Sequence, residues 1–194
     1  MIVFEVTKMN RSRAMIVTGV ILVVASLGLG GYNLYDDYRS HIKAEEILEK
    51  LEERMCDEKN EQSHNSLDIE ESEYCGILSI PQIDLRIPVS SKYTFSQMKK
   101  SLCRYAGSLD KNNMVICGHN NRAFLGRLDE VYEGDSVYYT DMNGREYEFL
   151  IIITEYLDGD AVDKMLEDSE EWDLSVFTCN YSGNLRYVIR CKMK

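Results

Sequence analysis

The stretch DSVYYTDMNGREYEFLIIITEYL, residues 135–157, decides the fold class that this 194-residue chain is expected to adopt. Asn143-Gly144 stands between two runs rich in β-branched and aromatic residues. An Asn-Gly pair in that position is a strong signal for a β-hairpin, because these residues tolerate the backbone conformations that a tight turn needs. The stretch therefore predicts two antiparallel strands joined by a short turn.

Similar short runs rich in strand-forming residues lie on both sides of this hairpin. Only residues 94–102 and 161–168 are expected to form short helical segments within this part of the chain. Seven or so short strands with little helix predict a mainly β fold, either a closed β-barrel or a β-sandwich. The further runs expected to form strands are 75–80, 85–90, 114–119, 173–179 and 185–192.

An apolar stretch near the N-terminus predicts a membrane anchor. Residues 14–35 comprise 22 consecutive positions without a charge, and roughly 20 helical residues span a hydrocarbon core of about 30 Å. Basic residues precede this stretch and two aspartates follow it, which favours a cytoplasmic N-terminus at residues 1–13. We therefore expect a single-pass transmembrane signal-anchor in the cell membrane. The alternative is a cleaved signal peptide, for which ASLG at 25–28 is a weak cleavage site.

The segment after the apolar stretch is expected to separate the anchor from the folded domain. Residues 40–56 carry apolar groups at helical spacing, with charged residues on the other face. Residues 57–73 are polar and acidic and show no periodicity. Together these features predict a helical and acidic extracytoplasmic linker at residues 36–73, followed by the folded domain at residues 74–194.

Composition argues against several functional classes. The formal net charge is -11 and no stripe of Lys and Arg is visible, so nucleic acid is not an expected partner. The six cysteines form no CxxC pair, which gives no support to a zinc ribbon or a thioredoxin-type centre, and no metal site is predicted. A domain of this size needs no disulfide staples, so most of the cysteines are expected to be buried apolar fillers.

One cysteine has neighbours that suit nucleophilic chemistry. A cysteine nucleophile needs a proton-exchanging partner and a cationic or N–H-rich pocket for the developing oxyanion. Of the three histidines, only His119 lies inside the predicted domain, at the end of an apolar strand. Cys179 ends another predicted strand, and Arg186 begins the next one. Taken singly, His119 and Cys179 are each more often structural, but antiparallel pairing of the two strands would bring Cys179 and Arg186 together.

Five segments of the chain resemble the sequence signatures of the sortase family, in the family's order. SVFTC at 175–179 resembles the TLxTC signature that ends in the family's cysteine, and RYVI at 186–189 resembles the Arg and apolar strand that follow it. Together the segments extend over about residues 75–192. The other three are VICGHN at 115–120, GILSIPQIDLRIPV at 76–89 and GDSVYYTDMNGREYEF at 134–149.

The resemblance implies a closed sortase-type β-barrel of about seven to eight strands with short helices, and the activity of a cysteine transpeptidase. It implies Cys179 as the nucleophile, His119 as the proton-transfer partner and Arg186 as the stabiliser of the oxyanion. Thr178 is expected to bind substrate or to pack, and Asn120 to line the substrate groove or to orient His119. No cofactor is implied.

The chain also departs from the family signatures. Two residues of the SVFTC segment replace the commoner Thr and Leu, a change that keeps strand propensity. Arg190 lies four residues after Arg186 on the same face of the strand and is a rival for the anion-stabilising role, although the spacing favours Arg186. The sequences GHNN at 118–121 and WDLSVFTC at 172–179 resemble those of class B-like or clostridial-type sortases more than those of class A sortases.

The resemblance also implies the partners of the reaction. The donors are expected to be surface proteins or pilins with a C-terminal sorting motif of the LPxTG kind. The acceptor is expected to be an amine of a peptidoglycan precursor or of a pilin lysine, and the enzyme meets the membrane through its N-terminal helix. Two alternatives remain open. One is a cysteine peptidase in which water resolves the acyl-enzyme, and the other is a non-catalytic surface β-module.

Overall fold

The computed structural model of the chain describes residues 11–57, 66–69, 72–167, 169–180 and 182–194. Within these residues one helix is long and the other helical segments are short. The main elements are α1 (Arg11–Asp57), β1 (Leu67–Ile69), β2 (Ser72–Ile80), β3 (Leu85–Ser90), η3 (Gln97–Lys99), β4 (Leu102–Ala106), β5 (Met114–Gly118), η5 (Leu128–Glu130), β6 (Ser136–Asp141), β7 (Glu146–Asp158), α2 (Val162–Met165), β8 (Leu174–Cys179) and β9 (Leu185–Met193).

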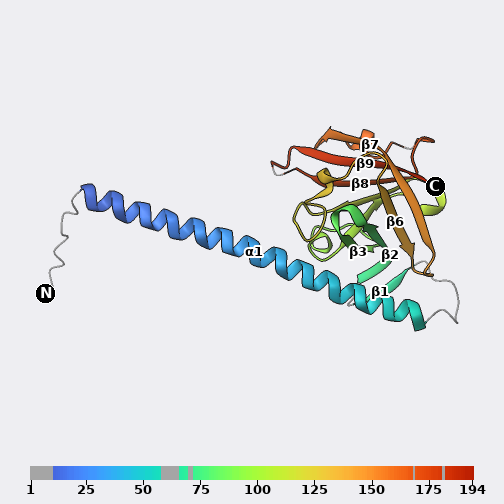
Figure 1. Ribbon diagram of the computed structural model, residues 1–194, viewed down its shortest axis with the longest axis horizontal. Coiled ribbons are helices and arrows are strands. Elements are labelled where there is room, and N and C mark those ends of the chain that lie inside the picture. The colour runs from blue at the N-terminus through green and yellow to red at the C-terminus, as the bar shows by residue number, and fades with distance from the viewer. Residues whose placement is uncertain (1–10, 58–65, 70–71, 168, 181) are drawn as a thin grey trace. The chain divides into compact units, whose positions relative to one another are not determined.

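The strands of the described chain form a barrel (Figure 1). They follow the order β2-β3-β4-β5-β8-β9-β7-β6, and β6 pairs back onto β2, which closes the ring. The short strand β1 pairs with the first residues of β2. Closure removes the exposed edges that an open sheet presents. The predicted mainly β fold with a closed barrel and short helices is confirmed, and the sandwich alternative is wrong.

The β6–β7 hairpin forms where the sequence predicts it. The two strands pair in antiparallel register on either side of the Asn-Gly pair. Gly144 adopts a φ of 76°, a left-handed conformation that glycine enters without strain, whereas Asn143 keeps a negative φ. The Asp141 carboxylate accepts hydrogen bonds from the backbone N–H groups of Asn143 and Arg145, at 3.0 and 2.9 Å. The turn is therefore closed both by the glycine and by the aspartate before it.

Side-chain alternation gives β8 two differently covered faces. Leu174 and Val176 point into the barrel and belong to its main hydrophobic core. Phe177 points to the outer face, where it packs in a second cluster with Val188 of β9 and Met165 of α2. The β7–β8 connection therefore covers this outer face, and the face that carries Phe177 is the one on which the catalytic cysteine is expected.

The sequence pattern does not indicate strand β4. The strand is short, carries Arg104 at its centre, and pairs with β3 through only two residues, Leu102 and Cys103. Its place in the barrel depends on distant neighbours, so its local signal is weak. The helical segment expected at 94–102 shortens to the single turn of η3, and the second expected helical segment shortens to α2.

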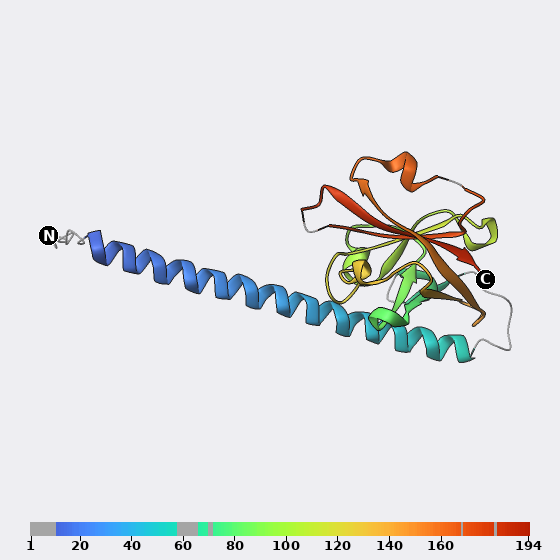
Figure 2. The ribbon, with the colours of Figure 1, turned by 45° about the horizontal axis from the view of Figure 1, so that its top comes forward.

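The chain divides into two compact units, of which the second begins at Arg39 and contains the barrel. In this unit the last part of α1 packs against β1 and β2 (Figure 2). Ile47, Leu51 and Met55 recur at helical spacing, are buried, and share a small core with Ile77 of β2. The apolar stripe of this helical segment is thus part of the folded unit.

Replacing Leu51 by Ala is expected to lower the free energy of unfolding of the second unit. The side chain is 0% exposed, and truncating a buried leucine costs about 2–5 kcal/mol because it leaves a cavity. The measurement is urea unfolding of the full chain in detergent micelles, followed by the fluorescence of Trp172, the one tryptophan in the sequence. Leu48→Ala, on the same helix but only partly buried, is the matched control and should cost less. Equal small losses for both variants would show that the helix adds nothing to barrel stability.

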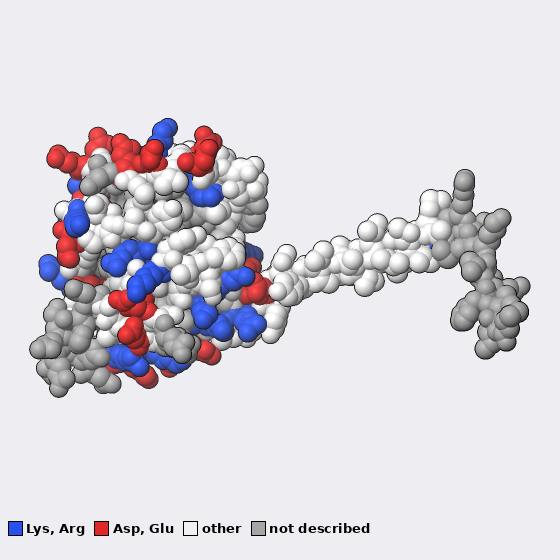
Figure 3. Space-filling model, turned by 180° about the vertical axis from the view of Figure 1, so that it is seen from behind, with Lys and Arg blue, Asp and Glu red and all other residues white. Residues whose placement is uncertain are grey.

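The first unit, which ends at Tyr38, carries the apolar stretch of α1. Within the described residues, one helix is long and apolar enough to cross a membrane, Arg13–Cys56. Figure 3 shows its apolar stretch as a surface without charges, whereas the second unit carries many. Exposed apolar side chains over such a length fit a lipid environment. The signal-anchor at 14–35 stays a prediction, and the expectations for residues 1–10, 58–65 and 70–71 lie outside the described residues.

Candidate active site

Two parallel strands that end at the same edge of the barrel bring His119 and Cys179 together. The last residues paired between β5 and β8 are Gly118 and Thr178. His119 directly follows the first of these and Cys179 directly follows the second. Neighbouring strands lie about 4.8 Å apart, so the two side chains start from adjacent backbone positions. The register of the two strands therefore places His119 and Cys179 next to each other at one edge of the barrel.

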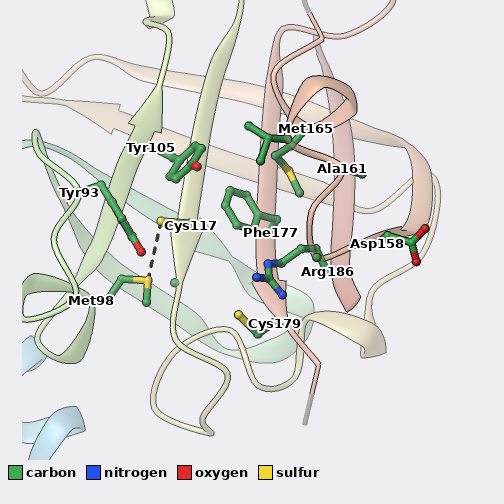
Figure 4. Close-up of a pocket in the computed structure, with 13 residues that line it drawn as sticks. Tyr93, Met98, Tyr105, Cys117, Asp158, Ala161, Met165, Phe177, Cys179 and Arg186 are labelled. Atoms are coloured by element: carbon green, nitrogen blue, oxygen red, sulfur yellow. Dashed lines mark hydrogen bonds between the residues drawn. The ribbon is translucent and has the colours of Figure 1, made fainter. Parts of the chain in front are cut away.

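Arg186 faces Cys179 across the antiparallel pair β8–β9, where the two residues are direct partners. Figure 4 shows the thiol and the guanidinium at the same end of a cleft that both residues line. The guanidinium Nη1 donates to the backbone carbonyls of Gly183 at 2.9 Å and Leu185 at 3.2 Å, so the β8–β9 turn holds it. Among the described residues these bonds use Nη1, which leaves Nε and Nη2 as donors for an anion beside Cys179.

The cleft beside Cys179 has a volume of about 130 Å³ and a largely aromatic and apolar lining. The ring of Phe177, two residues before Cys179, packs edge-on against Tyr105 with centroids 5.3 Å apart. Tyr105 packs in the same way against Tyr93, also at 5.3 Å. Met165 of α2 lines the opposite wall. A cleft of this kind suits an extended peptide with apolar side chains.

The β7–β8 connection is fixed beside the edge of the barrel at which Cys179 lies. The backbone N–H of Gly159 donates to the carbonyl oxygen of Asn184 at 2.7 Å. A Cβ at position 159 would lie 2.9 Å from that oxygen and 3.3 Å from Nη1 of Arg186, so this close approach needs glycine. The contact joins one wall of the cleft to the turn that holds Arg186.

Cys179 differs from the buried cysteines in its surroundings. Burial raises the pKa of the Cys103 thiol to about 11, and it also raises the pKa values of Cys75, Cys117 and Cys191. Since the thiolate is the nucleophile, these four thiols react poorly at neutral pH. Cys179 is only half-buried and lines the cleft, and the expectation that most cysteines are buried fillers is confirmed. Within the described residues, no group of three or more His, Cys, Asp or Glu side chains could hold a metal ion.

Arg190, the rival cation, ties the β7–β8 connection to the sheet. Its side chain is 1% exposed, and its Nε lies 2.9 Å from a carboxylate oxygen of Glu155. Its Nη1 donates to the Ser175 hydroxyl at 2.9 Å, and its Nη2 donates to the Lys164 carbonyl at 2.7 Å. Four residues of strand separate it from Arg186, a distance of about 13 Å. Its donors therefore serve the wall of the cleft and not the end at which Cys179 lies.

Thr178 and Asn120, the two residues expected to bind substrate, lie in different settings. Thr178 is buried on the barrel side of β8, and its hydroxyl donates to the Gly118 carbonyl at 2.9 Å. Because its side chain lies on the barrel side, Thr178 faces away from the cleft. Its hydrogen bond links β5 to β8 directly before His119 and Cys179 and so helps to fix the spacing between these two residues. Asn120 is half-buried and directly follows His119.

The aromatic wall of the cleft is the part of the site that the sequence does not reveal. Tyr93, Tyr105 and Met165 come from three separate segments, and only the order of strands in the barrel brings them to one cleft. The chain contains 13 tyrosines, but their number does not indicate which of them line a site. The sequence feature that could have indicated this wall is the pair of predicted short helical segments, because η3 and α2, which form there, carry cleft residues.

Comparison with known proteins identifies relatives of the barrel. A model of the sortase domain matches residues 78–194. Sortase D of Bacillus subtilis (strain 168) is 28% identical to this chain over 183 residues, a stretch that covers 87% of this chain and 90% of the relative. These matches cover the strands that carry His119, Cys179 and Arg186.

Solved structures share the fold at low identity. A sortase D5 transpeptidase from Clostridium perfringens matches with a TM-score of 0.58 and 18% identity, over 78% of this chain and 96% of that chain. Sortase C of Clostridium perfringens, solved with the C-terminal cell wall sorting motif, matches with a TM-score of 0.56 and 19% identity, over 78% and 89%. The predicted family resemblance is confirmed, and the subclass stays a prediction.

Proposed function

Because the chain belongs to the sortase family, whose domain matches residues 78–194, we propose that Cys179, His119 and Arg186 carry out transpeptidation in this protein. Sortases are cysteine transpeptidases that act on sorting motifs, and this chain shares that activity class. The strongest support for the three roles is the strand register, which pairs Cys179 with Arg186 and ends β5 directly before His119.

In the first half of the proposed reaction, the Cys179 sulfur attacks the carbonyl carbon of a threonine in the donor's sorting motif. A C–S bond forms, the carbonyl oxygen takes up negative charge, and the Arg186 guanidinium donates hydrogen bonds to that oxygen. The peptide C–N bond then breaks, and the leaving amine takes a proton from His119. The products are a thioester on Cys179 and a free C-terminal fragment of the donor.

In the second half, a neutral amine of the acceptor attacks the thioester carbon. The amine loses a proton to His119, and Arg186 again stabilises the oxyanion. The C–S bond breaks, which releases the new amide and returns Cys179 to its thiolate form. This sequence balances protons and electrons with the chain's own side chains.

The donor that fits the cleft is a peptide with an LPxTG-like motif. Tyr93, Met98 and Phe177 offer apolar surface beside Cys179, where leucine and proline side chains would leave water. The clostridial sortase C was solved with a C-terminal cell wall sorting motif, which supports a donor of this class for the present chain. We further propose that Thr178 sets the spacing of the catalytic pair and that Asn120 orients the imidazole or contacts the donor.

The N-terminal apolar helix fits a membrane anchor, and sortases are cell-surface enzymes. We propose that residues 14–35 cross the membrane once, with residues 1–13 in the cytoplasm and the barrel outside, beyond the segment 36–73. Surface proteins or pilins are then the donors. An amine of a peptidoglycan precursor or a pilin lysine is the acceptor.

Product analysis tests the proposed function. The full chain in detergent micelles is incubated with a library of LPxTG-like peptides and a small primary amine, and the products are followed by mass. An amide-exchanged product is expected. Free acid alone, formed at the same rate with and without amine, would instead indicate a cysteine peptidase. The absence of any product, together with uniform reactivity of the cysteines, would indicate a non-catalytic module.

Replacing Arg186 by Met is expected to reduce kcat/KM for the donor by about 10²–10³-fold, because one preorganised oxyanion donor is worth roughly 2.7–4 kcal/mol. The unfolding temperature should stay close to that of the unmodified chain, since within the described residues the Arg186 side chain donates its hydrogen bonds to turn carbonyls. Arg190→Met is the matched comparison, and the loss of its partly buried ion pair and of its hydrogen bonds to Ser175 and Lys164 should cost about 1–3 kcal/mol of stability. If Arg190→Met instead lowered activity without lowering stability, the anion-stabilising role would belong to Arg190 and not to Arg186.

A further inference from the structure

Two tyrosines pair on the strands beside the candidate active site, and a third lies in the segment between η5 and β6. Tyr156 of β7 and Tyr187 of β9 are direct cross-strand partners, with ring centroids 4.9 Å apart and planes inclined by 59°. Tyr156 is 59% exposed and Tyr132 is 71% exposed, whereas Tyr187 is half-buried against the main core. We call Tyr132, Tyr156 and Tyr187, together with Asp129, the tyrosine patch.

The other two members of the patch come from one segment of the chain: Asp129 lies in η5, and Tyr132 lies between η5 and β6. Burial raises the pKa of the Tyr187 hydroxyl, a hydrogen bond with Thr154 partly offsets this, and the charges of Tyr156, Asp129 and Tyr132 raise the pKa further. Asp129 is exposed on η5, in the segment that follows β5. The backbone N–H of Tyr132 donates to the Asp135 carboxylate at 2.9 Å, which fixes this segment. The patch therefore combines exposed aromatic faces with an exposed carboxylate.

The patch lies directly behind the catalytic edge. Tyr187 follows Arg186 along β9 and is the register partner of Thr178, the residue before Cys179. With strands about 4.8 Å apart and about 3.3 Å per residue, the backbones of Tyr187 and Cys179 lie about 6 Å apart. Arg186 faces the cleft, whereas Tyr187 faces the barrel side of the same sheet. Since β8 ends at Cys179, the side chain of a bound ligand that reaches around this end of the strand can contact first the patch and then Cys179.

We propose that the tyrosine patch receives the protonated amine of the acceptor. The faces of tyrosine rings attract a cation, and an adjacent carboxylate adds a complementary charge. The inference rests on the proposed function, which requires an amine to reach the thioester from a side that the donor peptide does not occupy. The donor fills the cleft on one side of the sheet, and the patch lies on the other. The amine loses one proton to solvent as it leaves the patch, attacks the thioester as a neutral amine and then gives its second proton to His119.

The acceptor kinetics of patch variants test this assignment. The full chain in detergent micelles is supplied with a saturating LPxTG-like donor and a varied concentration of Nα-acetyl-lysine amide. Tyr156→Ala and Asp129→Asn are each expected to raise the KM for the amine about five- to tenfold, since they remove a cation-binding face or its partner charge. Phe95→Ala is the matched control, because Phe95 is 66% exposed, has its own cation in Lys99 at 5.2 Å, and lies in neither site.

A cation that cannot react gives an independent test. Choline is expected to compete with the amine and not with the donor, whereas its uncharged isostere 3,3-dimethylbutan-1-ol should compete with neither. Tyr156→Ala should weaken the inhibition by choline about five- to tenfold. Unchanged amine KM values in both patch variants, or no inhibition by choline, would overturn the patch assignment while amide exchange continues. The absence of amide exchange in the unmodified chain would instead overturn the proposed function itself.

Discussion

Replacing Cys179 by Ala is expected to abolish both donor cleavage and amide exchange, with kcat lowered on the order of 10⁴–10⁶-fold. Without the sulfur no thioester can form, and only the Arg186 guanidinium and the cleft remain to act on the donor. Mass spectrometry of the protein mixed with donor should detect an acyl-enzyme in the unmodified chain and none in the variant. The unfolding temperature should change little, because Cys179 is only half-buried at the end of a strand.

The cysteine prediction has two controls within the chain. Cys117→Ala changes a thiol that lines the same cleft, but burial raises the pKa of that thiol, so amide exchange should stay within about tenfold of normal. Cys56→Ala removes the exposed thiol on α1, after which iodoacetamide at neutral pH should modify Cys179 alone. If amide exchange were lost in Cys117→Ala and kept in Cys179→Ala, the nucleophile would lie on β5 and the proposed mechanism would be refuted.

Replacing His119 by Ala is expected to lower kcat for amide exchange by about 10²–10⁴-fold, the range that general acid–base groups contribute. The imidazole is proposed to act in both halves of the reaction, so donor cleavage and amine attack should both slow. Added imidazole should restore part of the rate, because it can supply the missing proton transfer without restoring the side chain. Steady-state kinetics with and without imidazole provide the measurement.

His41 supplies the matched control for His119. It lies on α1, where its side chain is 52% exposed and its Nε2 is 3.2 Å from a carboxylate oxygen of Glu45. His41→Ala should therefore leave amide exchange unchanged. Normal exchange in His119→Ala, or equal losses in both variants, would be evidence against a direct catalytic role for His119.

The parts of the fold that could be predicted are those whose signals act locally. The β6–β7 hairpin has its turn residue, Gly144, and its strand-forming residues in one continuous stretch. Strand β4 has neither, because its place depends on pairing with β3 and β5. The packing of the last part of α1 on the barrel could not be predicted from local signals either. An apolar stripe containing Leu51 shows that a helix has a buried face, but it does not identify the surface that buries it.

The same distinction applies to the candidate site. Cys179 and Arg186 could be placed together from the sequence, because they flank one short turn between antiparallel strands. His119 reaches this edge through the parallel pairing of β5 with β8, which is distant in sequence, and the family resemblance was the signal for it. The cleft walls at Tyr93 and Met165 depend on the strand order of the whole barrel, which no local pattern contains.

The contacts of Arg190 have a consequence for how this enzyme can diversify. Its guanidinium binds the connection between β7 and β8 through the backbone carbonyls of Lys164 and Met165, and it stacks over Trp172 at 4.7 Å. Backbone acceptors are present whatever side chains the connection carries. The loop that lines one wall of the cleft can therefore exchange much of its sequence while its attachment to the barrel persists. The wall of the cleft and the edge that carries Cys179 can thus evolve, or be engineered by loop grafting, as separable modules.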